Sequence, residues 1–225
     1  MRRSGDMYEI TLIFALAFLF LIVYFVGMYR NRKIAVSYAR TVKEHMSQRS
    51  TFVGFHPYSR GGFRALCKLK EKEPFTEVEM AVSLVDRENL MHYPLSLLTK
   101  DKDRLACWGF LKGSISFSVE ILPIKDEKLC LKVASERGLT RVVSDDEFYE
   151  SFAVLASDHK LASKLLSDRR LQKHILEMKA FIKRLSLSEK ESRLYLISDL
   201  KEVSSIKSLI DTFMYCGERC AKFQA

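Results

Sequence analysis

The uncharged run at residues 10–29 constrains this sequence more than any other feature. A stretch of about 20 apolar residues is what a helix needs to cross the hydrocarbon core of a bilayer. A surface helix of a soluble domain would instead keep a polar side. We therefore predict a transmembrane helix over residues 9–29, preceded by a short extracytosolic N-terminus at residues 1–8.

A cleaved signal peptide is the main alternative for this segment. The apolar core of a signal peptide is usually roughly 7 to 15 residues long, which is shorter than the run seen here. The run also continues directly into Arg30, Arg32 and Lys33 rather than into a small-residue cleavage site. These two features favour a retained anchor.

The cations that flank the run predict its orientation, because Lys and Arg are enriched on the cytoplasmic side of short flanks. Only Arg2 and Arg3 precede the run, together with Asp6 and Glu9. The cations that follow it are Arg30, Arg32, Lys33, Arg40 and Lys43. We expect an outside or lumenal N-terminus and a cytosolic C-terminal domain, in the ER membrane of a eukaryote or the cell membrane of an archaeon.

The remaining chain has the length of one ordinary domain, which we expect to be a single cytosolic α+β domain over residues 51–225. The five cysteines are an odd number and include no CxxC pair. That pattern indicates free thiols in a reducing compartment rather than a disulfide framework.

The spacing of apolar residues predicts a helix and then a sheet. Ile34, Tyr38, Val42 and Met46 recur every fourth residue, which predicts a juxtamembrane amphipathic helix over residues 30–50. From Phe63 the period changes to two, which is typical of strands. About five strands of a mainly antiparallel sheet are expected, at residues 63–69, 78–84, 105–111, 114–122 and 129–133.

The second half of the domain is predicted to be mainly helical. Asp145 and Asp146 could cap a short segment, residues 152–156 form an apolar run that could be a strand, and Leu161 with Leu165 begins a helical pattern. Further elements are expected at residues 171–185 (an amphipathic helix), 194–197 (a strand) and 204–223 (a final helix). The apolar side of that last helix would pack on the sheet, or in part form a groove for a partner.

Known catalytic and cofactor motifs are missing from the sequence: there is no Walker loop, dinucleotide fingerprint, HExxH, GxSxG or kinase signature. The histidines, which include His92, are far apart in the sequence and do not have the spacing of metal ligands. Cys216 and Cys220 are one helical turn apart, but no second pair of Cys or His residues accompanies them to complete a metal site. Trp108 is expected in the core. We expect no enzymatic activity, cofactor or metal, although a membrane-tethered enzyme whose catalytic residues converge only in the fold stays an alternative.

Two basic zones flank an acidic middle, and they are the surface features with a functional implication. Residues 30–72 hold 11 Lys and Arg against two acids, whereas residues 73–157 hold 15 acids against 10 bases. The second basic zone could bind RNA phosphates or anionic lipid headgroups. If it binds only lipid headgroups, the chain would be a lipid-binding regulator. Its candidate residues are Arg169, Arg170, Lys173, Lys179, Lys183 and Arg184.

The order of these features resembles the coiled-coil-domain, or calumin-like, subunit of the PAT complex, a translocon-associated intramembrane chaperone. The matching stretches are NRKIAVSYARTVKEHM (31–46), TFVGF (51–55), FRALCKLK (63–70), LQKHILEMKAFIKRL (171–185), RLYLI (193–197) and IDTFMYCGERCAKF (210–223).

The resemblance implies a non-enzymatic protein that helps multi-spanning membrane proteins to insert and fold. Its partners would be a small Asterix-like membrane subunit, the Sec translocon, ribosomal RNA and anionic lipid headgroups. Both basic zones would face the RNA or the lipid, the first of them through Arg30, Arg32, Lys33, Arg40 and Lys43. Contacts with a partner helix in the membrane are expected at Phe14, Phe18, Leu21 and Phe25. The sequence differs from the larger members of the family in two ways: it lacks their long basic C-terminal coiled coil, and it has few residues before residue 8. A minimal version of the family, such as an archaeal one, would show both differences.

Overall fold

The computed structural model describes residues 3–58, 61–89 and 101–223, and it has the expected α+β class. The strands are β1 (Ser50–Tyr58), β2 (Gly62–Leu69), β3 (Phe75–Ser83), β4 (Asp103–Leu111), β5 (Val119–Pro123), β6 (Thr140–Val142), β7 (Phe152–Ala156), β8 (Ile182–Ser188) and β9 (Arg193–Leu200). The helices are α1 (Arg3–Ser47), α3 (Glu127–Arg137), α4 (Glu147–Ser151), α5 (His159–Leu166), α6 (Arg169–Glu177), α7 (Val203–Cys220) and the short 3₁₀ helix η1 (Ala221–Phe223).

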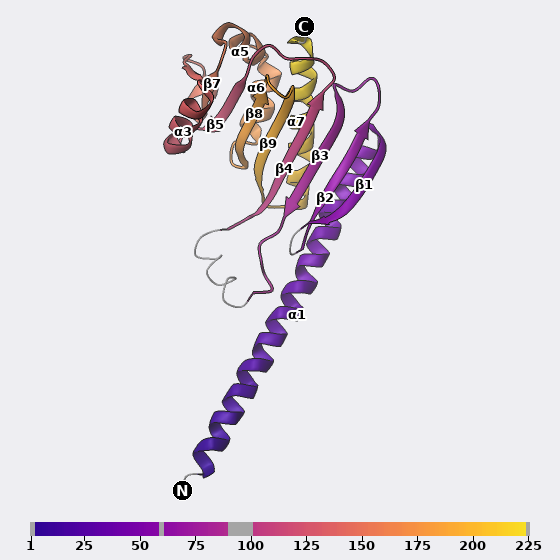
Figure 1. Cartoon of the computed structure of the whole chain (residues 1–225), viewed down its shortest axis with the longest axis vertical. Coiled ribbons are helices and arrows are strands. Elements are labelled where there is room, and N and C mark those ends of the chain that lie inside the picture. Colours follow the sequence, from indigo (N-terminus) through magenta and orange to yellow (C-terminus); the bar gives the residue numbers. More distant parts are fainter. Residues whose placement is uncertain (1–2, 59–60, 90–100, 224–225) are drawn as a thin grey trace.

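Helix α1 is a single element of 45 residues that extends far beyond the rest of the fold (Figure 1). The residues spaced at four in its second half pack into the core, with Tyr38, Val42 and Met46 almost fully buried. His45 pairs with Asp211 of α7 at 2.7 Å. The predicted helix after the apolar run is therefore present, and it continues the apolar run without a break.

All strands join one antiparallel sheet in the order β1-β2-β3-β4-β9-β8-β5-β7-β6. The first four strands are neighbours in sequence, whereas β4 pairs with β9, so that Asp103 lies opposite Leu200. The described residues form nine strands, whereas seven were predicted: five in the first half of the domain and two more at residues 152–156 and 194–197. The strand expected at residues 114–122 begins only at Val119, and β1, β6 and β8 were not predicted.

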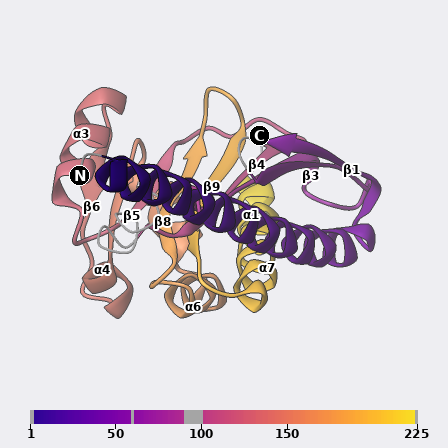
Figure 2. The ribbon, with the colours of Figure 1, turned by 90° about the horizontal axis from the view of Figure 1, so that it is seen from below.

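One face of the sheet carries the main core. Helices α4, α6 and α7 lie on this face, with the second half of α1 beside α7 (Figure 2). Phe75 stacks on Phe213 at 5.2 Å between ring centroids. A Cβ at Gly109 or Gly217 would lie within 2.6 Å of the Phe75 ring, so these glycines make the room for it. The apolar side of the final helix is thus buried against the sheet.

The opposite face carries a smaller core under α3. Neighbouring strand residues point to opposite faces, so Ile121 joins the main core while Leu122 joins the smaller one with Leu155. The prediction of a strand at residues 129–133 is wrong, because this segment lies in α3. Val133 and its partly buried neighbours form one helix face that packs on Leu122.

The predicted helix at residues 171–185 is also wrong in its second half. Helix α6 ends at Glu177, and residues from Ile182 onward form β8. A bulge between Ile182 and Arg184 lets Ile182 and Leu185 both reach the core, although an odd spacing would place them on opposite faces of a regular strand. Because of the bulge, these two buried residues of the strand are three positions apart, which is the spacing expected for one face of a helix.

Candidate functional site: a membrane anchor and a polar groove

Residues 8–26 of α1 are mainly apolar and exposed. The helix is long and apolar enough to cross a membrane. The expected partner-helix residues are separated by four, three and four positions, which places them along one side of the helix. They are all exposed: Phe14, Phe18, Leu21 and Phe25. This side is therefore open to lipid or to another helix.

The anchor is joined to the domain at Gly27 and Asn31. A Cβ at Gly27 would lie 2.2 Å from the backbone oxygen of Arg87, so only glycine permits this approach. Asn31 is 1% exposed, and its Nδ2 donates to the backbone oxygen of Val85 at 3.0 Å. The segment that follows β3 thus lies directly against α1.

Charged groups complete this junction. Arg87 donates through Nη1 and Nη2 to the two carboxylate oxygens of Asp103, each at 3.0 Å, and through Nη1 to Asn31 Oδ1 at 2.9 Å. Burial and the negative charge of Asp103 raise the pKa of the nearby Tyr38 to about 12, against the opposing effect of Arg87. An ionic network therefore fixes the sheet to the helix.

The first basic zone lies on the exposed surface of α1, just beyond this junction. All five predicted residues are exposed: Arg30, Arg32, Lys33, Arg40 and Lys43. They are available to lipid headgroups or to another macromolecule.

The second basic zone is divided by the sheet. Arg169, Arg170 and Lys173 are exposed on α6, which covers the main core, and Lys179 is exposed in the turn that follows. Lys183 and Arg184 belong to β8; Lys183 pairs with Asp199 at 3.2 Å on the other face of the sheet. A single basic helix was expected, but the bulge and the strand put its last two cations on a different surface.

A groove of about 400 Å³ lies on this other face, between α3 and the centre of the sheet. Strand register brings four side chains into one row across β4, β9, β8 and β5. They are Trp108, Tyr195, Ser186 and Glu120. Ser186 lies at the floor with the buried Glu120 beneath it, and the two rings, stacked at 5.4 Å between centroids, form one wall.

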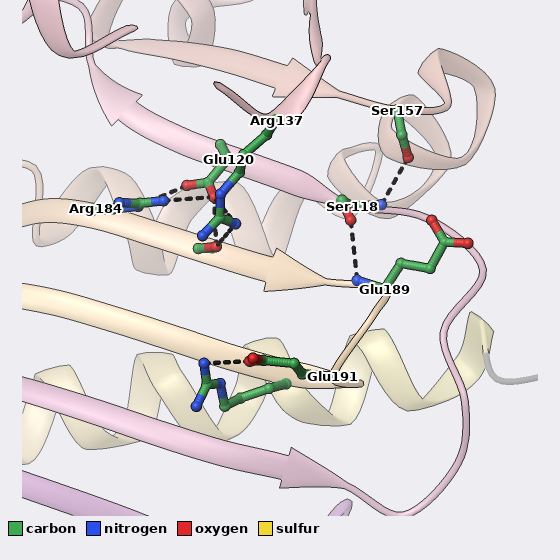
Figure 3. A network of polar contacts seen from close by, with 9 residues as sticks. Ser118, Glu120, Arg137, Ser157, Arg184, Glu189 and Glu191 are labelled. Carbon is green, nitrogen blue, oxygen red and sulfur yellow. Dashed lines mark hydrogen bonds and ion pairs between the residues drawn. The ribbon is translucent and has the colours of Figure 1, made fainter. Parts of the chain in front are cut away.

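Glu120 holds two arginines at the base of this groove (Figure 3). It is 0% exposed. Arg184 donates to both of its oxygens at 2.9 Å, Arg137 Nη1 donates at 2.6 Å and the Ser186 hydroxyl donates at 2.7 Å. The hydrogen bond to Glu120 raises the pKa of Arg184 despite its partial burial. The carboxylate is thus fully bonded and keeps both guanidinium groups in place.

The rim of the groove is polar. Ser118 Oγ accepts a hydrogen bond from the backbone N–H of Glu189 at 3.0 Å, and Ser157 Oγ accepts one from the backbone N–H of Ser118 at 2.9 Å (Figure 3). The other lining residues are Glu136, Leu139, Ser188, Lys190, Glu191 and Arg193.

The sequence interpretation missed this groove because Trp108 was expected in the core. The tryptophan is only half-buried, whereas Leu105, Cys107 and Leu111 of the same strand are buried. Side chains alternate between the two faces along a strand, so Trp108 lies on the face opposite to Leu105 and Cys107. This alternation in the sequence could have predicted that Trp108 lies outside the main core.

Three of the described histidines have separate partners in the fold. His45 pairs with Asp211, His159 lies 2.6 Å from the Thr140 hydroxyl and His174 packs on Tyr215. His92 lies outside the described residues. Within residues 3–58, 61–89 and 101–223, no group of three or more His, Cys, Asp or Glu side chains could hold a metal ion.

No protein-family model matches the sequence, and no curated protein matches it. Among solved structures, the crystal structure of the mycobacterial trehalose monomycolate transport factor A, TtfA, is similar over 88% of this chain and 94% of that chain. The sequence identity is 11% and the TM-score is 0.33. Similarity at this level supports no inference about what the present chain does.

Proposed function

We propose that this chain is a non-enzymatic, single-pass membrane protein whose domain binds macromolecular partners at the cytosolic membrane surface. The continuity of α1 is the observation that carries the proposal. Residues 8–26 of the helix are mainly apolar and exposed, and one side of its second half belongs to the core of the domain. A flexible linker would leave the domain free to reorient. A continuous helix instead suits a subunit that holds its partners at a fixed height above the bilayer.

The end of the membrane span follows from the charges at the junction. Asp86, Arg87 and Glu88 belong to the segment that packs on Gly27, and ionised groups are costly in hydrocarbon. We therefore place the cytosolic boundary near residue 26. Residues 10–26 then span about 25 Å at 1.5 Å per residue, close to the lower limit for crossing a bilayer.

The exposed cations support the orientation. Arg30, Arg32 and Lys33 would lie just beyond this boundary, where the enrichment of Lys and Arg on the cytoplasmic side favours a cytosolic domain. They are also placed to attract anionic lipid headgroups, each by about 1 kcal/mol near the surface. The membrane would be that of the ER in a eukaryote and the cell membrane in an archaeon.

The more specific proposal is that the chain assists insertion and folding of multi-spanning proteins beside the Sec translocon and the ribosome. The resemblance to the calumin-like subunit of the PAT complex motivates it. The exposed side of α1 with Phe14, Phe18 and Leu21 supports pairing with a small membrane subunit, and the exposed cations of α6 support contact with ribosomal RNA.

Affinity purification of the tagged chain from native membranes in mild detergent tests this proposal. Translocon subunits, a small membrane protein and ribosomes should be recovered at low salt. Ribosomes should be lost at high salt, because phosphate contacts release counterions. Recovery of neither translocon nor ribosome at low salt would contradict the proposal.

A charge-reversal series separates α6 from general electrostatics. Replacing Arg169, Arg170 and Lys173 by Glu should greatly reduce ribosome recovery. The matched control replaces Lys125, Lys128 and Lys132 by Glu, which changes the charge equally at exposed positions around α3. Equal loss in both variants would remove α6 as the contact, and binding to anionic vesicles without ribosomes would favour a lipid-binding regulator.

A further inference from the structure

We propose that the groove on the sheet binds a small, soluble phosphomonoester that carries a flat ring, such as a nucleoside monophosphate. The floor of the groove supplies the positive charge. Glu120 is one carboxylate between the guanidinium groups of Arg137 and Arg184, so the three groups together carry one net positive charge.

The two arginines are pre-organised for an anion. Among the contacts of the described residues, Arg137 donates only through Nη1, to Glu120 and Ser186, and Arg184 donates through Nε and Nη2. Their remaining N–H groups are left for a ligand. Because Glu120 already fixes both side chains, little conformational entropy is lost when an anion binds.

The arrangement of donors fits phosphate better than a carboxylate. Arg137 approaches from the end of α3, Arg184 from β8, and the hydroxyl of Ser188 from the end of the same strand. Lys190 adds a cation at the rim, where Arg193 is paired with Glu191. Donors that converge from several directions match the three terminal oxygens of a phosphomonoester, whereas a carboxylate offers two oxygens in one plane.

The wall of the groove supplies a surface for a ring. Trp108 and Tyr195 stack on each other with an interplanar angle of 27°, and both are half-buried. Bases and other planar rings bind to such aromatic surfaces by stacking, with little dependence on their sequence or substituents. A ligand with both a phosphate and a ring would use the floor and the wall together.

The position of the groove favours a soluble ligand over a lipid headgroup. Strand β4 begins at Asp103, beside the junction with α1, and runs away from the exposed end of α1 (Figure 1). Trp108 lies five residues along this strand, which is about 17 Å along the strand at 3.4 Å per residue and so places it up to that much further from the membrane. A headgroup in the bilayer that holds α1 is therefore out of reach.

The fluorescence of Trp108 provides the test, because it is the only tryptophan in the chain. The full chain in nanodiscs of uncharged lipid, without detergent, is titrated with adenosine monophosphate, adenosine, inorganic phosphate, and vesicles that contain a phosphoinositide. A saturable fluorescence change with adenosine monophosphate is expected, with binding at least tenfold weaker for adenosine, inorganic phosphate and vesicles. No saturable change, or equal binding of inorganic phosphate or vesicles, would overturn the proposal.

Two variants and one control locate the binding. Arg137→Gln keeps the Glu120–Arg184 pair and should weaken binding at least tenfold; Lys190→Ala, at the exposed rim, should weaken it several-fold. Arg104→Gln is the control, because Arg104 is an exposed cation on the same sheet face outside the groove. Thermal unfolding checks that each variant is folded. Unchanged affinity in both groove variants would overturn the assignment.

Discussion

Gly27 of α1 contacts the backbone carbonyl of Arg87, in the segment that follows β3, at a distance that no side chain would allow. Arg87 in turn holds Asp103 at the start of β4. One glycine therefore determines how closely the sheet approaches the anchor, and the ion pair behind it holds the segment after β3 against the start of β4.

Replacement of Gly27 tests the importance of this contact. Alanine is favoured over glycine inside a helix by about 1 kcal/mol, so an unhindered site would be stabilised. Here the added Cβ would collide with backbone atoms, and we expect Gly27→Ala to destabilise the domain by about 1–3 kcal/mol, as overpacking usually does. Urea unfolding in micelles measures the change. Met28→Ala, at an exposed neighbour, should have little effect, and a more stable Gly27→Ala variant would contradict the prediction.

Glu120→Gln tests the buried ionic network. The substitution keeps the shape of the side chain but leaves Arg184 and Arg137 without their counter-charge. Removing one partner of a buried ion pair typically costs about 3–5 kcal/mol, and we expect about 3 kcal/mol because Arg137 is partly exposed. Glu136→Gln, at an exposed position of α3, is the control and should change the free energy of unfolding by less than about 0.5 kcal/mol. A similarly small effect of Glu120→Gln would show that the network contributes little.

The sequence predicted the elements whose signal is local. The fourfold spacing of Tyr38, Val42 and Met46, and the twofold spacing that begins at Phe63, each correspond to an element of the expected type. Burial on one side produces these periods directly, so the juxtamembrane helix and the class of the fold could be predicted.

Features that depend on distant partners could not be predicted. The groove requires β4 to pair with β9, which brings Trp108 beside Tyr195 from the far end of the chain. The segment 171–185 was misread because the bulge at Ile182 gives a strand the apolar spacing of a helix. Glu120 lies in an apolar run; its partner Arg184 was predicted as part of a basic helix, and Arg137 was not singled out.

Asp168 predicts a defined pH dependence. It caps α6 by accepting hydrogen bonds from the backbone N–H groups of Arg170 and Leu171, and it pairs with Arg219 at 2.6 Å. Burial acts to raise the pKa of its carboxyl, but these N–H groups, the Tyr215 hydroxyl and Arg219 together lower it. Because the folded pKa is below the unfolded value of about 3.9, the stabilisation is present above pH 4 and is lost as the pH falls through the folded pKa.

The variant Asp168→Asn should therefore be less stable at pH 7 by on the order of 1–2 kcal/mol, since asparagine still caps a helix but does not pair with Arg219. The difference from the natural chain should shrink as the pH falls below about 4. Urea unfolding at a series of pH values measures it. Asp158→Asn, at the cap of α5, is the matched control, and a difference for Asp168→Asn that is independent of pH would exclude the charge as the cause.

The five thiols should react in two classes. Burial raises the pKa of Cys67 and of Cys220 to about 12, and raises those of Cys107 and Cys216 as well, so these four are both covered and protonated at pH 8. Cys130 on α3 is partly exposed; burial and the charge of Asp126 raise its pKa too, which should make it slow.

With an aromatic disulfide reagent at pH 8, we expect one thiol to react in the folded chain and all five to react in urea. The variant Cys130→Ser should abolish the reaction of the folded chain while leaving four thiols in urea. Rapid reaction of two or more thiols in the folded chain would mean that the core under α7 opens easily. In that case the core against which Tyr38, Val42 and Met46 of α1 pack would not hold the helix rigidly, as the proposed function requires.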